Sequence, residues 1–195
     1  MNRLRCLFAI LLLITVSCSN GAGIEDPPEP LPTPESEKTL IVYFSWSGNT
    51  RTVANMIHDL TDCDIVEIEV EEPYSDVYNE VTARARHELD NDIRPALRTR
   101  IENTDKYDTL IVGTPIWGSH LASPVKSFLA QDDLSDKIIP PFCTHGGSRT
   151  AQSVSDIREV CPDSDILQPL AVYGNRAGNS RNDVIQWLQT IGIIK

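Results

Sequence analysis

Short apolar runs alternate with amphipathic stretches from Thr39 to the end of the chain, and this alternation limits the possible folds more than any other feature. The run 39–44 is almost wholly apolar and is followed by Ser and Gly, which is typical of a strand buried on both faces. Residues 50–60 then place their apolar side chains on one stripe of a helix. Strands and helices that alternate at this spacing predict a parallel sheet with helices on both faces.

The same reasoning locates the remaining elements. The expected strands are 39–44, 64–70, 109–113, 138–143 and 166–172, and the expected helices are 50–60, 74–89, 124–129, 150–160 and 181–191. Pro140 and Pro141 weaken the fourth strand, because proline cannot donate a hydrogen bond to a neighbouring strand. The segment 90–105 is expected to be irregular.

The N-terminus has the pattern of an export signal. Arg3 and Arg5 precede the apolar run 6–14, which is too short to span a bilayer. The Ser17-Cys18 junction resembles the bacterial lipobox, although Thr15 stands where Leu is usual. The resemblance implies a lipoprotein signal peptide over 1–17, lipidation of Cys18, and a lipid-anchored protein that faces the periplasm or the cell exterior. An ordinary cleaved signal with an incidental cysteine is the alternative.

Residues 18–38 are rich in proline and acidic side chains, which predicts an extended tether before one domain over 39–195. The chain has 17 Lys and Arg against 28 Asp and Glu, a formal net charge of −11. Such a field disfavours nucleic acid as a partner and leaves the lipid as the expected membrane contact. The cysteines form no CxxC or Cys/His spacing, so no metal site is expected. No disulfide is expected either, because Cys63 and Cys161 would lie at opposite edges of the sheet.

The first loop that carries chemistry runs from Ser45 to Thr50. Hydroxyls and free amides at the start of a helix bind anions, whereas the Lys of a P-loop and the dinucleotide fingerprint are both missing from this loop. The segment is similar to the S/T-x-S/T-G-N-T phosphate loop of flavodoxins, which bind FMN. This resemblance implies that the FMN phosphate is held by Ser45, Ser47, Gly48, Asn49 and Thr50. A simple helix cap is the alternative.

The second loop follows the third strand. It resembles the P-x-W/Y-x loop of flavodoxin-like oxidoreductases, which implies that the flavin is contacted by Pro115, Ile116, Trp117 and Gly118. Trp117 would stack on the flavin ring, or alternatively cover the core of its own domain. Trp46 has the same two options, and we expect His120 to be a solvated loop residue.

The third loop contains Thr144, His145, Gly146 and Gly147, and it looks more like the loop of flavin-dependent NAD(P)H quinone reductases than that of small flavodoxins. The glycines let the backbone approach the pyrimidine edge of the flavin. His145 is the candidate catalytic residue, as a hydrogen-bond donor or proton source, with a backbone-bonded loop histidine as the alternative. Cys143 is expected to pack in the interior.

The segment 74–100 carries the phrase Y-x-x-x-Y-N-E-V followed by E-L-D-N-D-x-R-P, which is similar to one bacterial flavodoxin-like family. Its arginines either line a substrate or nicotinamide phosphate site or pair with acidic neighbours on a solvated helix face.

Taken together, the resemblances imply a flavodoxin-like three-layer α/β/α sandwich, with a five-stranded parallel sheet in the order 2-1-3-4-5. In such a sheet the loops after strands 1, 3 and 4 converge. The implied function is an FMN oxidoreductase that passes electrons to a quinone, a flavin or a similar small acceptor, and related enzymes often form homodimers. A tethered electron carrier that serves a redox protein partner is the second hypothesis, and a binding module without FMN is the third.

Overall fold

The computed structural model describes residues 38–195, so the predicted signal peptide, Cys18 and all of the tether except Lys38 lie outside the described residues. The strands are β1 (Thr39–Tyr43), β2 (Asp64–Glu67), β3 (Thr109–Trp117), β4 (His120–Leu121), β5 (Ile138–Ile139), β6 (Pro141–His145), β7 (Asp165–Ile166) and β8 (Leu170–Tyr173). The helices are α1 (Asn49–Thr61), α2 (Tyr78–Asp90), α3 (Ser123–Leu129), α4 (Ser153–Val160) and α5 (Arg181–Thr190). Among these residues no helix is both long and apolar enough to cross a membrane.

The sheet confirms the predicted order 2-1-3-4-5, with its last two positions each split into two short strands. β1 lies between β2 and β3, and all three are parallel. β5 and β6 form one line beside β3, because Thr109 pairs with Ile138 and Val112 pairs with Pro141 at the same offset. Pro140 interrupts that line, since it lacks an N–H group to donate. β7 and β8 form the fifth position beside β5 and β6.

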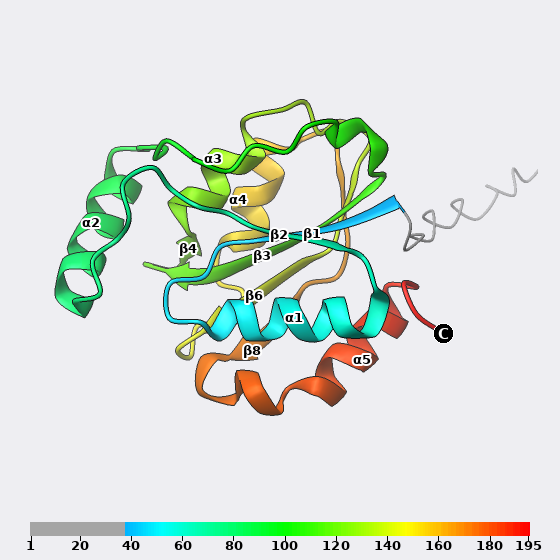
Figure 1. Ribbon diagram of the computed structural model, residues 1–195. Coiled ribbons are helices and arrows are strands. Elements are labelled where there is room, and N and C mark those ends of the chain that lie inside the picture. The colour runs from blue at the N-terminus through cyan, green and yellow to red at the C-terminus, as the bar shows by residue number, and fades with distance from the viewer. Residues whose placement is uncertain (1–37) are drawn as a thin grey trace, which may run out of the picture. The chain divides into compact units, whose positions relative to one another are not determined.

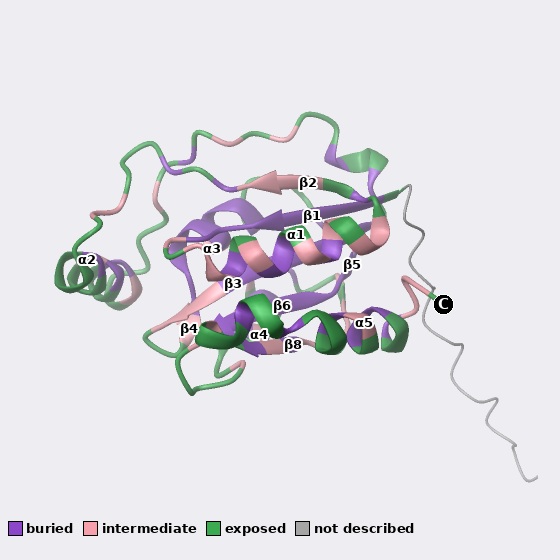
Figure 2. Cartoon of the chain, turned by 60° about the horizontal axis from the view of Figure 1, so that its bottom comes forward, coloured by how far each residue is buried: buried purple, intermediate pink, exposed green. Residues whose placement is uncertain are grey.

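Helices cover both faces of the sheet, as predicted. Figure 1 shows α1 and α5 on one face, α3 and α4 on the other, and α2 beyond the sheet at the left of the view. Alternate residues of β1 serve the two faces: Leu40 and Val42 belong to the core under α3 and α4, whereas Ile41 and Tyr43 belong to the core under α1 and α5. Figure 2 shows this central sheet as the most buried part of the molecule.

The third strand differs from the prediction, because it continues through Trp117 and turns back. Trp117 pairs with His120 in an antiparallel β3–β4 hairpin, where a loop had been expected. The two turn residues, Gly118 and Ser119, have φ values of 52° and 72°. Two successive positive φ values are typical of a tight hairpin turn that suits the twist of its strands. The hairpin therefore holds Trp117 on a strand instead of a loop.

The second helix also begins later than predicted, at Tyr78 instead of Tyr74. The Tyr74 ring packs against Phe44 and Trp117, and its hydroxyl donates to the Glu88 carboxylate at 2.6 Å. Packing of Tyr74 against these rings keeps residues 74–77 out of the helix.

Candidate functional site

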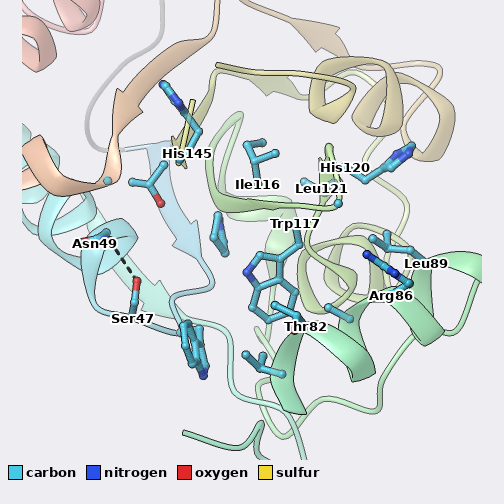
Figure 3. A pocket seen from close by; sticks show the side chains of 18 of the residues that line it. Ser47, Asn49, Thr82, Arg86, Leu89, Ile116, Trp117, His120, Leu121 and His145 are labelled. Carbon is cyan, nitrogen blue, oxygen red and sulfur yellow. Dashed lines mark hydrogen bonds between the residues drawn. The ribbon is translucent and has the colours of Figure 1, made fainter. Parts of the chain in front are cut away.

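The three predicted loops meet at one cavity of about 890 Å³ at the carboxyl ends of β1, β3 and β6. Its lining includes nine of the predicted cofactor residues, which are Ser47, Asn49, Pro115, Ile116, Trp117, Gly118, Thr144, His145 and Gly146. The other four, Ser45, Gly48, Thr50 and Gly147, lie in the same loops but are not among the lining residues. Figure 3 shows Ser47 and Asn49 on one side of Trp117 and Arg86 and Leu89 on the other. The convergence expected from the sheet order is thus observed, in a cavity of the size that holds cofactors.

The first loop has the geometry of an anion cradle. Gly48 stands at the N-terminus of α1 with a φ of 85°, a left-handed conformation that favours glycine. Among the described residues, no atom lies within 4 Å of where a Gly48 side chain would begin, and no side chain caps α1. The open helix start leaves its first amides to bind an anion.

Ser45 is the most informative residue of this loop. Its side chain is buried, yet its Oγ has no hydrogen-bond partner within the described part of the chain. A buried hydroxyl without a partner is costly and calls for an explanation. A ligand oxygen at the start of α1 would provide the missing partner.

The other residues of the loop have partners. Thr50 is buried, and its hydroxyl lies 2.8 Å from that of Thr144, so it links the first loop to the third. Ser47 Oγ accepts a hydrogen bond of 3.1 Å from Asn49 Nδ2 at the cavity wall. Thr50 therefore holds the two loops in register, and Ser47 and Asn49 face the ligand space.

Trp117 packs on the core, as in the second predicted alternative, and it also lines the cavity. Its stacking on a flavin stays a prediction. Its ring makes edge contacts with Phe44 at 5.4 Å and Tyr74 at 5.0 Å between centroids. Trp46 lines the same cavity, and its Nε1 donates to the Ser75 carbonyl at 2.9 Å. Both indoles are thus held in place by neighbours and present an aromatic wall.

His145 is constrained by its own loop. The Gly147 N–H donates to its Nδ1 at 3.0 Å, so the proton of the neutral ring resides on Nε2. Burial, aided by the charge of Arg149, lowers the pKa of His145 below its usual value and favours that neutral form. The backbone-bonded alternative is therefore observed, and the role of the Nε2–H as a donor to a ligand stays a prediction.

A neighbouring cavity of about 510 Å³ shares His145 and Tyr173 with the first. Two cations line it, Arg149 and Arg176, opposite the carboxylate of Asp183. His145 therefore stands between the two cavities.

The prediction for His120 was right in part, because its side chain is half exposed, but the residue lies on β4 and not in a loop. Its Nδ1 lies 3.1 and 3.2 Å from the two carboxylate oxygens of Asp156, so the ring is fixed by a partner instead of solvated freely. The Gly-Ser pair after Trp117 is a hairpin signal that would have placed His120 on a strand. Asp156 lies 36 positions further along the chain, and no local pattern connects it to His120.

Two further walls of the cavity were not foreseen. One is the segment after β8, which contributes Tyr173, Gly174 and Asn175. The other is the face of α2 that includes Val81, Ala85, Arg86 and Leu89. The segment after β8 carries no recognisable ligand-binding motif, and in α2 only the arginines were predicted as candidate site residues.

The arginines of 84–100 divide between the two predicted alternatives. Arg84 bonds Glu88 at 2.8 Å and lies 4.0 Å from the Tyr74 ring centroid, so it is structural. Arg98 lies 3.9 Å from the carboxylate of Glu69 at the surface. Arg86 instead lines the cavity.

The cysteines and carboxylates supply no metal centre in the described region. Cys63, Cys143 and Cys161 are buried and free, and no cluster of three or more His, Cys, Asp or Glu within 38–195 is placed to hold a metal ion. Burial raises the pKa of the Cys143 thiol to about 12, which agrees with its expected packing role.

The residues present fit FMN, the group implied by the sequence motifs. The unpartnered Ser45 hydroxyl and the open start of α1 suit a phosphate. Trp117 and Trp46 suit an aromatic ring system. At the third loop, side chains at Gly146 and Gly147 would meet no atom within 4 Å among the described residues, so space remains beside that backbone.

Comparison with known proteins agrees with this geometry. The family model described as Flavodoxin matches residues 38–191. A NAD(P)H dehydrogenase (quinone) of Acidovorax ebreus (strain TPSY) is 28% identical over 124 residues, covering 58% of this chain and 60% of that protein. The chain therefore spans less than two thirds of the length of this relative.

Solved structures agree as well. A protein of Bacteroides eggerthii DSM 20697 described as a flavoprotein has a TM-score of 0.71 and 26% identity, over 81% of this chain and 99% of that one. A flavoprotein of Lactobacillus acidophilus NCFM in complex with FMN has a TM-score of 0.63 and 24% identity, over 73% of this chain and 97% of that one. The second likeness shows the fold alone.

Proposed function

Because the chain belongs to the flavodoxin family, we propose that it is an FMN-dependent oxidoreductase that passes electrons to a quinone, a flavin or a similar small acceptor. One observation carries this proposal: an open helix start, an aromatic wall and a glycine loop meet at a single cavity. A binding module that had lost FMN would have no need to keep all three together.

The first loop would bind the phosphate of FMN. Ser45, Ser47 and Asn49 would bind the phosphate with their side chains, and the backbone at Gly48 would do so with its amides. Thr50 is assigned a positioning role, because its hydroxyl is already bonded to Thr144. The chain carries a net negative charge, which repels anions. The attraction of a phosphate therefore depends on the donors of this loop.

The second and third loops would contact the ring system of FMN. FMN supplies the redox chemistry when bound, because its ring system exchanges one or two electrons. Trp117, which is held in place by Phe44 and Tyr74, would cover a face of the ring and exclude water. His145 holds a proton on Nε2 at the edge of the cavity and is the candidate donor to a developing negative charge.

The nature of the acceptor is supported by the Acidovorax relative, whose name describes quinone reduction by NAD(P)H. The donor is either NAD(P)H or a redox protein. An anaerobic titration of the FMN-loaded protein with NADPH and then NADH, followed by flavin absorbance, distinguishes them. The proposal expects bleaching that is reversed by an added quinone. A bound flavin that no quinone reoxidises would contradict it.

A tethered electron carrier is the second candidate, and the acidity of the chain favours it. A carrier meets its partners through surface charge and needs no substrate site. In that case dithionite reduces the flavin but neither nucleotide does, and reoxidation requires a redox protein. The lining of the cavity by α2 and β4, outside the three loops, is the observation against this candidate.

We also propose that the protein works outside the cytoplasm, anchored by a lipid on Cys18. The support is the apolar run and lipobox-like junction before the tether. Labelling of cells with a fatty-acid probe is expected to mark the wild type and not Cys18→Ser. Equal labelling of both proteins, or of neither, would contradict the anchor.

A further inference from the structure

The cavity extends past the three cofactor loops into a part that none of them needs. We call this part the annex and define it by Val81, Ala85 and Leu89 of α2 together with His120 and Leu121 of β4, all of which line the cavity. Four of these side chains are apolar, and Figure 3 shows Leu89 and His120 on the far side of Trp117 from Asn49. The annex thus combines four apolar side chains with one imidazole.

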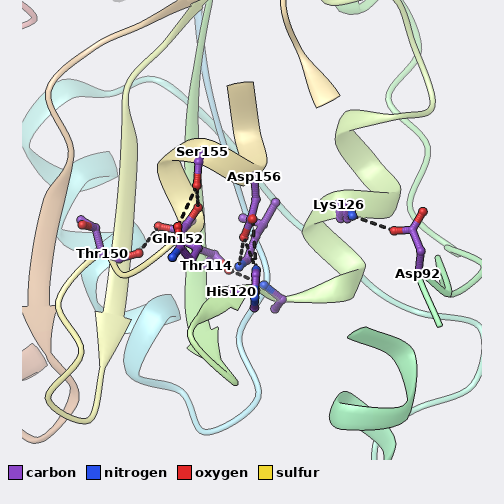
Figure 4. A network of polar contacts seen from close by, with 11 residues as sticks. Asp92, Thr114, His120, Lys126, Thr150, Gln152, Ser155 and Asp156 are labelled. Atoms are coloured by element: carbon purple, nitrogen blue, oxygen red, sulfur yellow. Dashed lines mark hydrogen bonds and ion pairs between the residues drawn. The ribbon is translucent and has the colours of Figure 1, made fainter. Parts of the chain in front are cut away.

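That imidazole is held in a defined orientation. His120 Nδ1 lies 3.1 Å from Asp156 Oδ1, and Asp156 Oδ2 also accepts the Leu121 N–H at 2.8 Å, as Figure 4 shows. The Asp156 side chain is 14% exposed and that of His120 is 46% exposed, so the carboxylate is the fixed member of the pair.

The pair decides which nitrogen of His120 remains available. An ionised carboxylate only accepts hydrogen bonds, so Nδ1 carries the proton that binds Asp156. Nε2 has no partner among the described residues. A carboxylate behind a histidine fixes its tautomer and its orientation. Nε2 of His120 is therefore the ring nitrogen that is left open to a ligand.

We propose that the annex binds a flat, largely apolar molecule that carries a hydrogen-bond-accepting oxygen, and that protonated His120 donates its Nε2–H to that oxygen. The apolar side chains of α2 and Leu121 would contact the ring of the ligand, and His120 would recognise its one polar end. This inference rests on the proposed function, because a quinone acceptor has this chemistry.

The proposal requires binding to strengthen as the pH falls. A protonated His120 offers a charged donor, whereas the neutral ring, with its proton on Nδ1, offers only a lone pair at Nε2. Other charged groups line the cavity: Arg86 and Asp90 on α2, Lys126 on α3, and Asp156 and Glu159 on α4. Lys126 is itself paired with Asp92 at 2.6 Å.

The variant Asp156→Asn tests whether the pH dependence of binding comes from His120 or from another titrating group. The amide oxygen can still accept the Leu121 N–H, while the amide nitrogen donates to His120 Nδ1. The neutral ring then carries its proton on Nε2 and remains a donor at every pH. Affinity in this variant should therefore become nearly independent of pH, even though His145 still titrates in the same cavity. His87→Gln is the matched control, since His87 is a histidine of α2 that does not line the cavity.

The experiment measures the affinity of menadione for the protein saturated with oxidised FMN, from pH 6 to 8, by calorimetry. We expect wild type and His87→Gln to bind roughly tenfold or more tightly at pH 6 than at pH 8, the effect of one charge-assisted hydrogen bond. 2-Methylnaphthalene has the same carbon skeleton without the oxygens, so its affinity should not change with pH.

Three results would overturn the inference: no binding of menadione, a pH dependence that survives in Asp156→Asn, or menadione that displaces FMN. The proposed function is judged separately, because these measurements involve no turnover. If the protein binds menadione as predicted but never reduces it, the proposal for the annex stands and the proposed reductase function is wrong.

Discussion

Replacement of Ser45 by Ala should strengthen the fold of the FMN-free protein and weaken its binding of FMN. The Ser45 hydroxyl is buried without a partner among the described residues, so the folded state bears its desolvation cost. Removal of that hydroxyl should raise the free energy of unfolding by about 1 kcal/mol. In the complex the same hydroxyl would bind a charged phosphate, so its loss should weaken FMN binding by roughly 10- to 100-fold.

The assay combines urea unfolding of the FMN-free protein with titration of FMN by fluorescence quenching. Ser153→Ala is the control, because Ser153 is also buried but its Oγ donates to the Thr150 carbonyl at 2.7 Å. That variant should lose about 1 kcal/mol of stability and bind FMN as the wild type does. A Ser45→Ala protein that is less stable without FMN, or that binds FMN unchanged, would refute the reasoning.

Three further predictions concern other parts of the site. Arg149→Ala should raise the pKa of His145 in an NMR titration but leave it below the usual histidine value, because burial is the larger cause; an unchanged pKa would refute this. Trp117→Ala should shift the flavin potential in a redox titration and weaken FMN binding about tenfold or more, and unchanged values of both would remove Trp117 from the site. Burial raises the pKa of Cys143 from 9.0 to about 12, so its contribution to stability is complete below pH 9 and is lost as the pH rises to 12. Urea unfolding from pH 8 to 11 should therefore show a smaller decline for Cys143→Ala than for the wild type, and equal declines would contradict the assignment.

The sheet and its loops were predictable because their signals are local. The apolar run 39–44 and the later apolar runs predict the strands. The order of the strands in the sheet follows from the resemblance of the segment 45–50 to a known phosphate loop. The segment Thr114–Trp117 was predicted as a loop but is part of a strand. Pro115 indicated a loop, whereas the Gly-Ser pair that follows is a hairpin signal.

The annex was not predictable from the sequence, since its parts come from separate elements. His120 and Asp156 meet only because β4 lies beside α4 in the folded chain. α2 was recognised as a helix, but the side of it that faces the cavity depends on the packing of Tyr74 against Trp117. Such pairings depend on the tertiary structure, which periodicity and motifs do not specify.

The central claim, that the loop from Ser45 to Thr50 holds the phosphate of FMN, is tested most directly with a matched pair of ligands. Riboflavin has the ring system of FMN and lacks the phosphate. Titration of the FMN-free protein with each should show FMN bound at least roughly 100-fold more tightly than riboflavin, as expected for several charge-assisted hydrogen bonds at a helix start. Equal affinities for the two ligands would contradict the account.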